Sequence, residues 1–250
     1  MCELLGMSAK HATDVNQSLE VFQPRGGDTG PHADGWGIAY FDGRAAALFK
    51  ECMPAASSRC FATLAERSVR STQVIAHIRR ANPPQFGRSW ANTHPFEREL
   101  GGRSWVFAHN GKLPGIHEDP RFKTKHFQPL GDTDSERAFC HLLDVIRTVG
   151  TTIETWTPEA LLTALREPTA QLASLGEFNY LLGNGQLLVV HGHSRLSMLQ
   201  RTCSEDGCAQ RVTLVATQPL TDEAWQPLAP GSFVVLQDGV AVNARLGIPA

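Results

Sequence analysis

The chain has 250 residues, and its 23 Lys+Arg against 25 Asp+Glu give a formal net charge of -2 at pH 7, which argues against nucleic acid or an anionic membrane as a partner. With 42% hydrophobic and 19% charged residues the chain can bury a sizeable core, so wholesale disorder is excluded. No apolar run approaches the roughly 18 residues of a membrane span, and the short acidic start is unlike a signal peptide, so we expect a cytoplasmic protein.

The first part of the chain alternates predicted strands and helices. Val15, Leu19 and Phe22 recur at helical spacing, and Asp42-Gly43 is typical of a hairpin turn. In chain order we expect a strand at 2–8, a helix within 11–23, a hairpin at 36–41 and 45–49, a helix at 58–70, a strand at 73–78, a long irregular segment at 81–103 and a strand at 104–108 that ends at 109–111.

The clearest helical signal begins at about Ser135 and ends at Val149. Thr133 and Glu136 have the spacing of a capping box, and the apolar residues that follow form one stripe. Pro158 opens a second helix that runs through Leu165. The remaining chain predicts strands at 180–182, 187–191, 212–217, 233–236 and 240–242. Strands at both ends with helices between them predict a sheet-rich α+β fold of stacked layers.

The six cysteines are scattered through a long chain, which favours reduced thiols over a disulfide framework. Cys203 and Cys208, with His191 and His193 upstream, leave a zinc site open as a minor alternative. The histidines follow an apolar run, and Cys203 and Cys208 have four residues between them with no CxxC pair elsewhere, so the structural interpretation is favoured. We therefore expect neither a metal ion nor an organic cofactor.

Cys2 directly follows the initiator methionine. Removal of Met1 would expose a thiol and a free α-amine on one residue, and the amine, with an ordinary pKa of about 7.7 to 8.0, can act as the base for its own side chain. Alone this signal is weak, because a buried cysteine in a strand is the commoner situation.

Three further sites carry groups suited to acyl chemistry. Asn110 and Gly111 end a predicted strand, where a side-chain amide and a backbone N–H can form an oxyanion hole, although Asn-Gly is also a common turn. Arg79 ends another strand and can clamp a carboxylate, or it can form a salt bridge at the edge of the core. Asp134 precedes the strongest helix and can hold an ammonium group, or it can serve the helix N-terminus.

These residues belong to an ordered set of motifs that resembles the class II glutamine amidotransferases of the N-terminal nucleophile superfamily, and within it the stand-alone YafJ-like type. The motifs are Cys2, Asp34-Gly35-Trp36-Gly37, Ala76-His77-Ile78-Arg79, Asn92-Thr93-His94-Pro95-Phe96, His109-Asn110-Gly111 and Thr133-Asp134-Ser135-Glu136. The resemblance spans about residues 2–140. It implies a four-layer αββα sandwich of two mostly antiparallel sheets, with residues 1–250 as a single domain whose later hairpins complete the sheets.

The resemblance also implies a role for each matching residue. Cys2 would be the nucleophile with its own amine as base, Asn110 and Gly111 the oxyanion hole, and Arg79 and Asp134 the groups that bind the α-carboxylate and α-ammonium of the substrate. His94 would order the pocket loop on the substrate-binding side.

The substrate so implied is a γ-glutamyl amide, either glutamine or a γ-glutamyl conjugate. The chain departs from the family pattern after Arg79, where Arg80-Ala81-Asn82-Pro83-Pro84 replaces an Ala-Thr-x-Gly segment. The resemblance therefore supports a γ-glutamyl group in the substrate more firmly than it supports glutamine as the substrate. Two alternatives stay open. One is a glutaminase subunit that feeds ammonia to a partner synthase, and the other is a non-catalytic protein that binds glutamine or glutathione.

Overall fold

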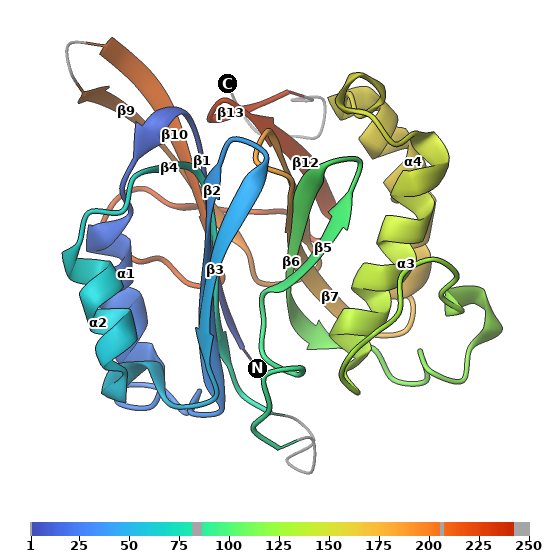
Figure 1. The fold of residues 1–250 in the computed structure, drawn as a ribbon. Coiled ribbons are helices and arrows are strands. Elements are labelled where there is room, and N and C mark those ends of the chain that lie inside the picture. The colour runs from blue at the N-terminus through green and yellow to red at the C-terminus, as the bar shows by residue number, and fades with distance from the viewer. Residues whose placement is uncertain (1, 82–86, 206–207, 243–250) are drawn as a thin grey trace.

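Two antiparallel β-sheets packed face to face form the middle of the molecule (Figure 1). The computed structural model describes residues 2–81, 87–205 and 208–242. Within these residues one sheet has seven strands, in the order β11 (Gln226–Pro227), β9 (Ser197–Glu205), β10 (Cys208–Ala216), β1 (Glu3–Thr13), β4 (Ser71–Arg79), β2 (Gly35–Asp42) and β3 (Ala45–Glu51). The other has six, in the order β13 (Val240–Ala241), β12 (Ser232–Gln237), β8 (Leu187–Gly192), β7 (Glu177–Gly183), β6 (Arg103–Lys112) and β5 (Phe96–Leu100).

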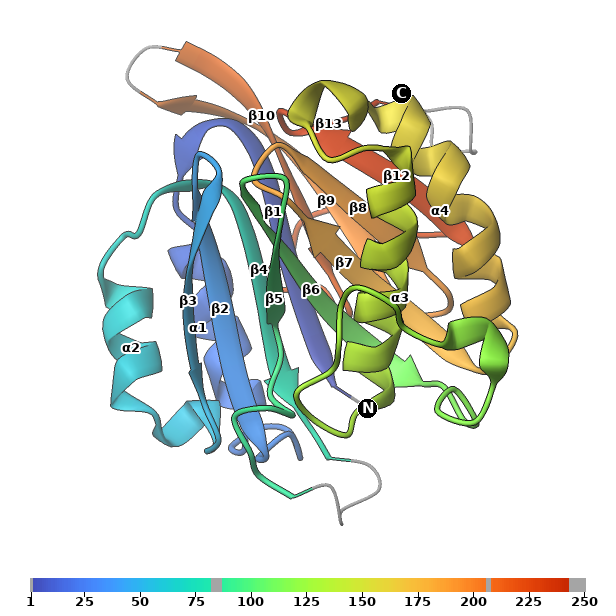
Figure 2. The same cartoon turned by 45° about the vertical axis from the view of Figure 1, so that its right-hand side comes forward.

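Helices cover the outer face of each sheet. Figures 1 and 2 show α1 (Asn16–Phe22) and α2 (Arg59–Glu66) on the seven-stranded sheet, and α3 (Asp134–Val149) and α4 (Pro158–Ala173) on the six-stranded sheet. Short 3-10 turns lie at Gln23–Arg25, Ala55–Ser57, Pro120–Phe122 and Ile153–Thr155. The order of layers is therefore helix, sheet, sheet, helix.

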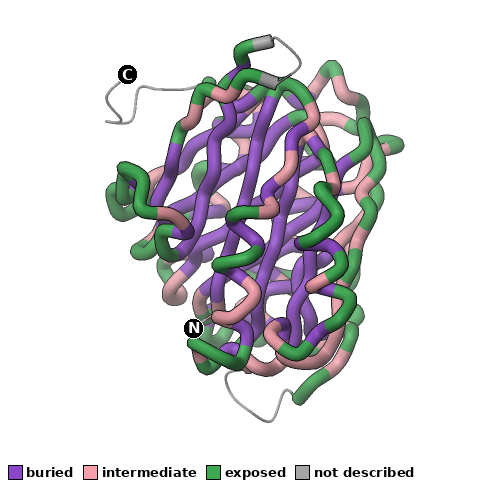
Figure 3. Tube along the Cα trace, turned by 90° about the vertical axis from the view of Figure 1, so that its left-hand side faces the viewer, coloured by how far each residue is buried: buried purple, intermediate pink, exposed green. Residues whose placement is uncertain are grey.

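Three apolar interfaces hold these layers together. Leu4, Ile75 and Val190 belong to the core between the sheets, and Figure 3 shows the central strands buried along most of their length. On the outer faces, Trp36 contacts Phe61 of α2 edge to face at 4.9 Å, and Phe107 stacks on Phe139 of α3 at 5.2 Å. The predicted α+β class and αββα layering are confirmed.

The predicted hairpin at 36–49 and the helix beginning near Ser135 are also found, but several boundaries were wrong. Residues 11–13 continue strand β1, so the first helix begins only at Asn16, and the second ends at Glu66 rather than near residue 70. Helix α4 passes Leu165 and includes Pro168, because Leu172 continues its buried face. The irregular segment predicted at 81–103 contains β5, and β9 was missed entirely.

The two-residue strand β11 was also missed, and the two longer missed strands share a cause. β5 has the sequence FEREL, in which only Phe96 and Leu100 are buried, and it lies at a sheet edge beside β6 alone. β9 also carries several polar residues, and its pairing with β10 and with the short β11 defines it. Among the described residues no helix is long and apolar enough to cross a membrane.

Candidate active site

The antiparallel register of β1 on β4 places the start of β1 beside the end of β4. Glu3 pairs with Ile78, which places Cys2 opposite Arg79 at the end of the sheet. The Cys2 thiol lies 3.6 Å from the carbonyl oxygen of Arg80 and accepts from the Arg80 backbone N–H at 3.4 Å. The half-buried nucleophile candidate is thus held by the backbone that follows β4.

Asn110 and Gly111 lie within β6 rather than in a turn, so the turn interpretation of Asn-Gly is wrong. The buried Asn110 side chain donates from Nδ2 to the carbonyl oxygen of Cys2 at 2.6 Å, and this contact links the two sheets. A Cβ on Gly111 would lie 1.7 Å from the carbonyl oxygen of Glu177 in β7. Only glycine allows β6 and β7 to pack this closely here.

Arg79 and Asp134 are each oriented by backbone groups. Arg79 is buried, and its Nη1 donates to the carbonyl oxygens of Gly87 at 2.7 Å and Asp34 at 3.4 Å. Asp134, the first residue of α3, accepts the N–H of Leu113 at 2.7 Å on Oδ2 and that of Ser135 at 2.8 Å on Oδ1. The Ser135 hydroxyl also lies 3.3 Å from Oδ1, so the remaining acceptor capacity of Asp134 for a ligand is on Oδ2.

The N-terminus of α3 is capped by Thr133, whose hydroxyl accepts the N–H of Glu136 at 3.2 Å. The reciprocal half of the predicted capping box is absent, because the Glu136 carboxylate instead accepts from the backbone N–H of Gly131 at 2.7 Å and from Arg98 at 2.5 Å. The helix end that carries Asp134 is therefore held by Glu136 contacts to the preceding loop, at Gly131, and to strand β5, at Arg98.

His94 is buried beside the same groups. Its ring stacks on His77 with centroids 4.2 Å apart, and the peptide bond to Pro95 is cis. Burial, followed by the neighbouring charge of His77, lowers the pKa of His94 well below its usual range. Neither ring nitrogen has a hydrogen-bond partner among the described residues. The imidazole is neutral at physiological pH.

A cavity of about 40 Å³ connects these residues. Cys2, Arg79, His94, Gly111 and Asp134 all line it, and Asn110 adjoins it through its bond to Cys2. The other lining residues are Arg80, Ala81, His109, Thr133 and Ser135. The structure thus brings every residue predicted for the site into one place. The larger cavity of about 710 Å³ beside α3 is lined by no cysteine.

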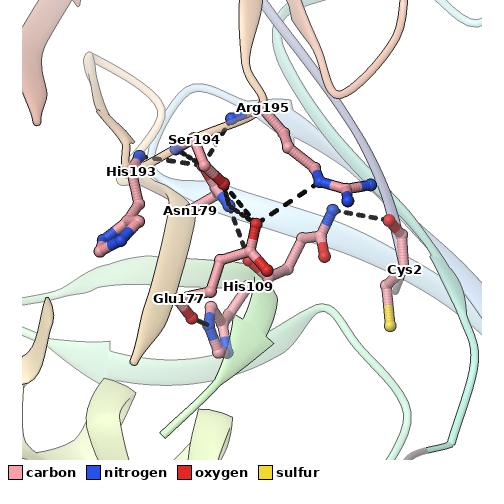
Figure 4. Close-up of polar contacts among 8 residues, drawn as sticks. Cys2, His109, Glu177, Asn179, His193, Ser194 and Arg195 are labelled. Atoms are coloured by element: carbon pink, nitrogen blue, oxygen red, sulfur yellow. Dashed lines mark hydrogen bonds and ion pairs between the residues drawn. The ribbon is translucent and has the colours of Figure 1, made fainter. Parts of the chain in front are cut away.

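His109 and Ser135 occur in the motifs, but the sequence predicts no role for either residue. Their side chains contact each other, with His109 Nδ1 2.8 Å from the Ser135 hydroxyl, and the second ring nitrogen of His109 lies 3.1 Å from the carbonyl oxygen of Glu177. Figure 4 shows the contact of His109 with the backbone of Glu177. Adjacency to the Asn-Gly pair was the only signal for His109.

The thiol of Cys2 has a raised pKa. Burial is the largest cause and Asp134 contributes, whereas the Arg80 N–H and the Arg79 guanidinium act in the opposite direction. At neutral pH the group is therefore a thiol and not a thiolate, and a nucleophilic attack by Cys2 needs a base to accept its proton.

The alternative zinc ligands are not brought together. His191 packs against Tyr180 and Phe233 in the six-stranded sheet, whereas Cys203 packs against the core on the outer face of the seven-stranded sheet. The side chain of Cys208 lies outside the described part of the chain. Among the described residues no cluster of three or more His, Cys, Asp or Glu is arranged to hold a metal ion.

Comparison with known proteins identifies relatives along almost the whole chain. The family model for class II glutamine amidotransferases matches residues 1–205. The Escherichia coli protein named "Putative glutamine amidotransferase YafJ" is 37% identical over 256 residues, covering 93% of this chain and 96% of its own. A Haemophilus influenzae protein named "Putative glutamine amidotransferase" is 34% identical over 268 residues, covering all of this chain and 88% of its own.

Solved structures share the fold. The 2.0 Å crystal structure of a predicted glutamine amidotransferase from Pseudomonas aeruginosa has 35% identity and a TM-score of 0.73, and the match covers 96% of this chain and 99% of that one. The glutamine phosphoribosylpyrophosphate amidotransferase of Bacillus subtilis has 19% identity and a TM-score of 0.63, and the match covers 96% of this chain and 48% of that one. The second match bears on the fold alone.

Proposed function

Because the chain belongs to the class II glutamine amidotransferase family, we propose that it cleaves a γ-glutamyl amide, glutamine or a γ-glutamyl conjugate, through a thioester on Cys2. One observation carries the proposal. A thiol, the two residues suited to an oxyanion hole, a guanidinium and a carboxylate surround a single cavity. Family membership supports amide chemistry at the general level, and the geometry supports this particular assignment of roles.

The charged pair would bind the amino-acid head of the substrate. The Arg79 guanidinium offers planar donors to an α-carboxylate, and Asp134 accepts from an α-ammonium. The backbone contacts of both side chains fix their orientation before a ligand arrives. Binding both charges of the head directs the γ-carbonyl along the cavity toward Cys2.

Cys2 would then attack the γ-carbonyl carbon. The C–S bond forms as the carbonyl π electrons move to oxygen, and the resulting oxyanion accepts from Asn110 Nδ2 and the Gly111 N–H. The Asn110 amide has two N–H groups, of which one is engaged by the Cys2 carbonyl oxygen at 2.6 Å. That bond determines which way the amide points.

The α-amine of Cys2, freed by removal of Met1, would accept the thiol proton. It returns that proton to the departing ammonia or amine as the C–N bond breaks and leaves a γ-glutamyl thioester. It then takes a proton from water, which attacks the thioester, and the thiol is regenerated with release of glutamate. His94 is a poor base at neutral pH because its pKa is lowered, so we assign it to shaping the pocket.

The preferred leaving group depends on the loop that replaces the family's Ala-Thr-x-Gly segment. Arg80 and Ala81 line the cavity, whereas 82–86 lie outside the described residues. We propose that residues 1–250 act as one catalytic domain, since β10 pairs with β1 and β12 pairs with β8, so the later strands are integral to both sheets.

Intact mass and glutamate release, measured on one preparation with glutamine and with a γ-glutamyl peptide, test the proposal. We expect a chain that lacks Met1, turnover of at least one substrate, and none with Cys2→Ala. Turnover that survives Cys2→Ala would refute the thioester. A processed chain that releases no glutamate alone would instead favour a subunit that needs a partner synthase, or a binding protein.

A further inference from the structure

Asn179 is a buried polar residue for which the proposed reaction has no use. It lies in β7 directly opposite Asn110 of β6. Its side chain is fully buried, and all its contacts are made inside the protein. A buried amide is costly unless it is hydrogen-bonded, so its partners indicate what it is for.

The nitrogen of the Asn179 amide faces the proposed oxyanion hole. Nδ2 makes its shortest contact as a donor to the backbone carbonyl oxygen of Asn110, at 3.1 Å, and it also lies 3.5 Å from Glu177 Oε1 and from the Ser194 hydroxyl. Asn110 in turn donates from its own side chain to the Cys2 carbonyl oxygen. One continuous chain of hydrogen bonds therefore runs from Asn179 through Asn110 to the backbone of the nucleophile.

The oxygen of the same amide holds the turn that follows β8. Oδ1 accepts three consecutive backbone N–H groups, those of His193 at 2.9 Å, Ser194 at 3.0 Å and Arg195 at 3.3 Å. Figure 4 shows the backbone of His193, Ser194 and Arg195 turned toward the Asn179 side chain. These three backbone N–H groups fix the orientation of the Asn179 amide.

Glu177 reinforces the same turn from two residues away. Its carboxylate accepts from the Ser194 hydroxyl and lies 3.5 Å from Nε of Arg195 (Figure 4). Its backbone oxygen contacts His109 and leaves no space for a side chain at Gly111. The start of β7 therefore contacts three consecutive residues of β6 at the proposed oxyanion hole.

We infer that Asn179 is a positioning residue, which anchors Asn110 to the turn at 193–195 and so sets the oxyanion donor relative to Cys2. The inference rests on the proposed function. Two properties of the amide are needed together, an acceptor for the turn and a donor for Asn110. Aspartate has the same shape and keeps an acceptor for the turn but loses the donor to Asn110. Asn179→Asp also places a second carboxylate 3.5 Å from Glu177, so an Asn110→Ala background isolates the part of the effect that passes through Asn110.

Asn184, which directly follows β7, provides a matched control. It is also fully buried, and its Oδ1 accepts the N–H groups of Leu187 at 2.8 Å and Gln186 at 3.0 Å in the turn between β7 and β8. Its Nδ2 has no partner among the described residues. Asn184→Asp therefore makes the same chemical change at the other end of β7 without removing a donor contact.

The first readout is kinetic. We expect Asn179→Asp to lower kcat roughly 10- to 100-fold, as small misplacements of catalytic groups do, with KM within about twofold because Arg79 and Asp134 are untouched. Asn184→Asp should leave kcat unchanged. In an Asn110→Ala background the Asn179→Asp loss should largely vanish, since Asn179 acts through Asn110. An undiminished loss in that background, or a kcat within twofold of wild type, would overturn the inference.

The second readout needs no turnover. The side-chain amide resonance of Asn110, identified by its absence from Asn110→Ala in protein labelled with 15N-asparagine, should shift with Asn179→Asp and stay in place with Asn184→Asp. An unmoved resonance refutes the inference whatever the activity. If Asn179→Asp shifts the Asn110 resonance but the wild-type protein releases no glutamate, the proposed function fails while the positioning contact stands. If Asn179→Asp does not fold, Asn179→Ala, which removes the acceptor together with the donor, should shift the same Asn110 resonance, and an unmoved resonance there refutes the inference equally.

Discussion

Gly111 gives the sharpest prediction, because the structure specifies what a single methyl group would meet there. In Gly111→Ala the new Cβ lies 1.7 Å from the Glu177 carbonyl oxygen and 2.7 Å from Nε2 of His109. The first contact is with backbone, so the strands must separate until the distance from Cβ to oxygen reaches at least 3.0 Å. Overpacking of this kind costs about 1–3 kcal/mol of folding free energy.

The same displacement moves the proposed oxyanion donors. A shift on the order of 1 Å at a catalytic group lowers turnover by about 10²-fold. We therefore expect Gly111→Ala to reduce kcat for glutamate release by about that factor and to lower Tm by several degrees. The assays are coupled detection of glutamate and thermal unfolding of the same samples.

Gly43→Ala is the control for backbone strain. Gly43 lies in the β2–β3 turn with φ +59°, and a Cβ there meets nothing within 4 Å. Alanine in this region costs about 1–2 kcal/mol of stability, and kcat should be unchanged. If Gly111→Ala kept both wild-type turnover and wild-type Tm, the tight packing of β6 on β7 and the role given to Gly111 would both be wrong.

Three further outcomes are expected. Asn110→Ala should lower kcat by about 10²- to 10³-fold as one oxyanion donor is lost, and normal turnover would remove Asn110 from the mechanism. Burial raises the pKa of Cys2, so its alkylation by iodoacetamide, followed by mass spectrometry of the Cys2 peptide, should rise with pH through a midpoint above that of a free thiol; Arg79→Gln should move the midpoint higher still, because Arg79 lowers that pKa. Burial also lowers the pKa of His77 and His94, so below about pH 6.5 the folded state binds fewer protons than the unfolded chain. The free energy of unfolding should therefore fall in that range by up to about 1.4 kcal/mol per pH unit for each histidine. Urea unfolding at pH 7.5 and 5.5 measures this loss, which His77→Phe should reduce; an equal loss in that variant would contradict the assignment.

Arg79, Asn110 and Asp134 could be singled out from sequence because each lies near the end of a strand or helix with a strong local pattern, whereas the roles given to them, and His94, came from the resemblance of the ordered motifs. Arg79 follows an unbroken buried run, and Asp134 opens the helix with the clearest stripe. Local patterns also indicated the hairpin around Gly43. Each of these signals is complete within about ten residues, so no knowledge of the tertiary structure was required.

Other features depend on partners that are distant in the sequence. β5 and β9 alternate too weakly to be recognised, and the neighbours β6 and β10 define them. Asn179 appeared only as the residue before a predicted strand. Its position opposite Asn110 follows from the register of β7 on β6. A shift of that register by one residue would move the Asn179 side chain to the other face of the sheet, and local propensity does not encode the register.

The packing of the two sheets connects the fold to the chemistry. Cys2 precedes β1 in one sheet and Asn110 belongs to β6 in the other, so the 2.6 Å bond between them exists only when the sheets are at their correct separation. Gly6 shows how close that approach is, since a Cβ there would lie 2.9 Å from a methyl carbon of Leu181. Interiors packed to this density transmit small displacements. The distance from nucleophile to oxyanion donor is therefore set by the apolar core between the sheets as well as by the residues that line the cavity.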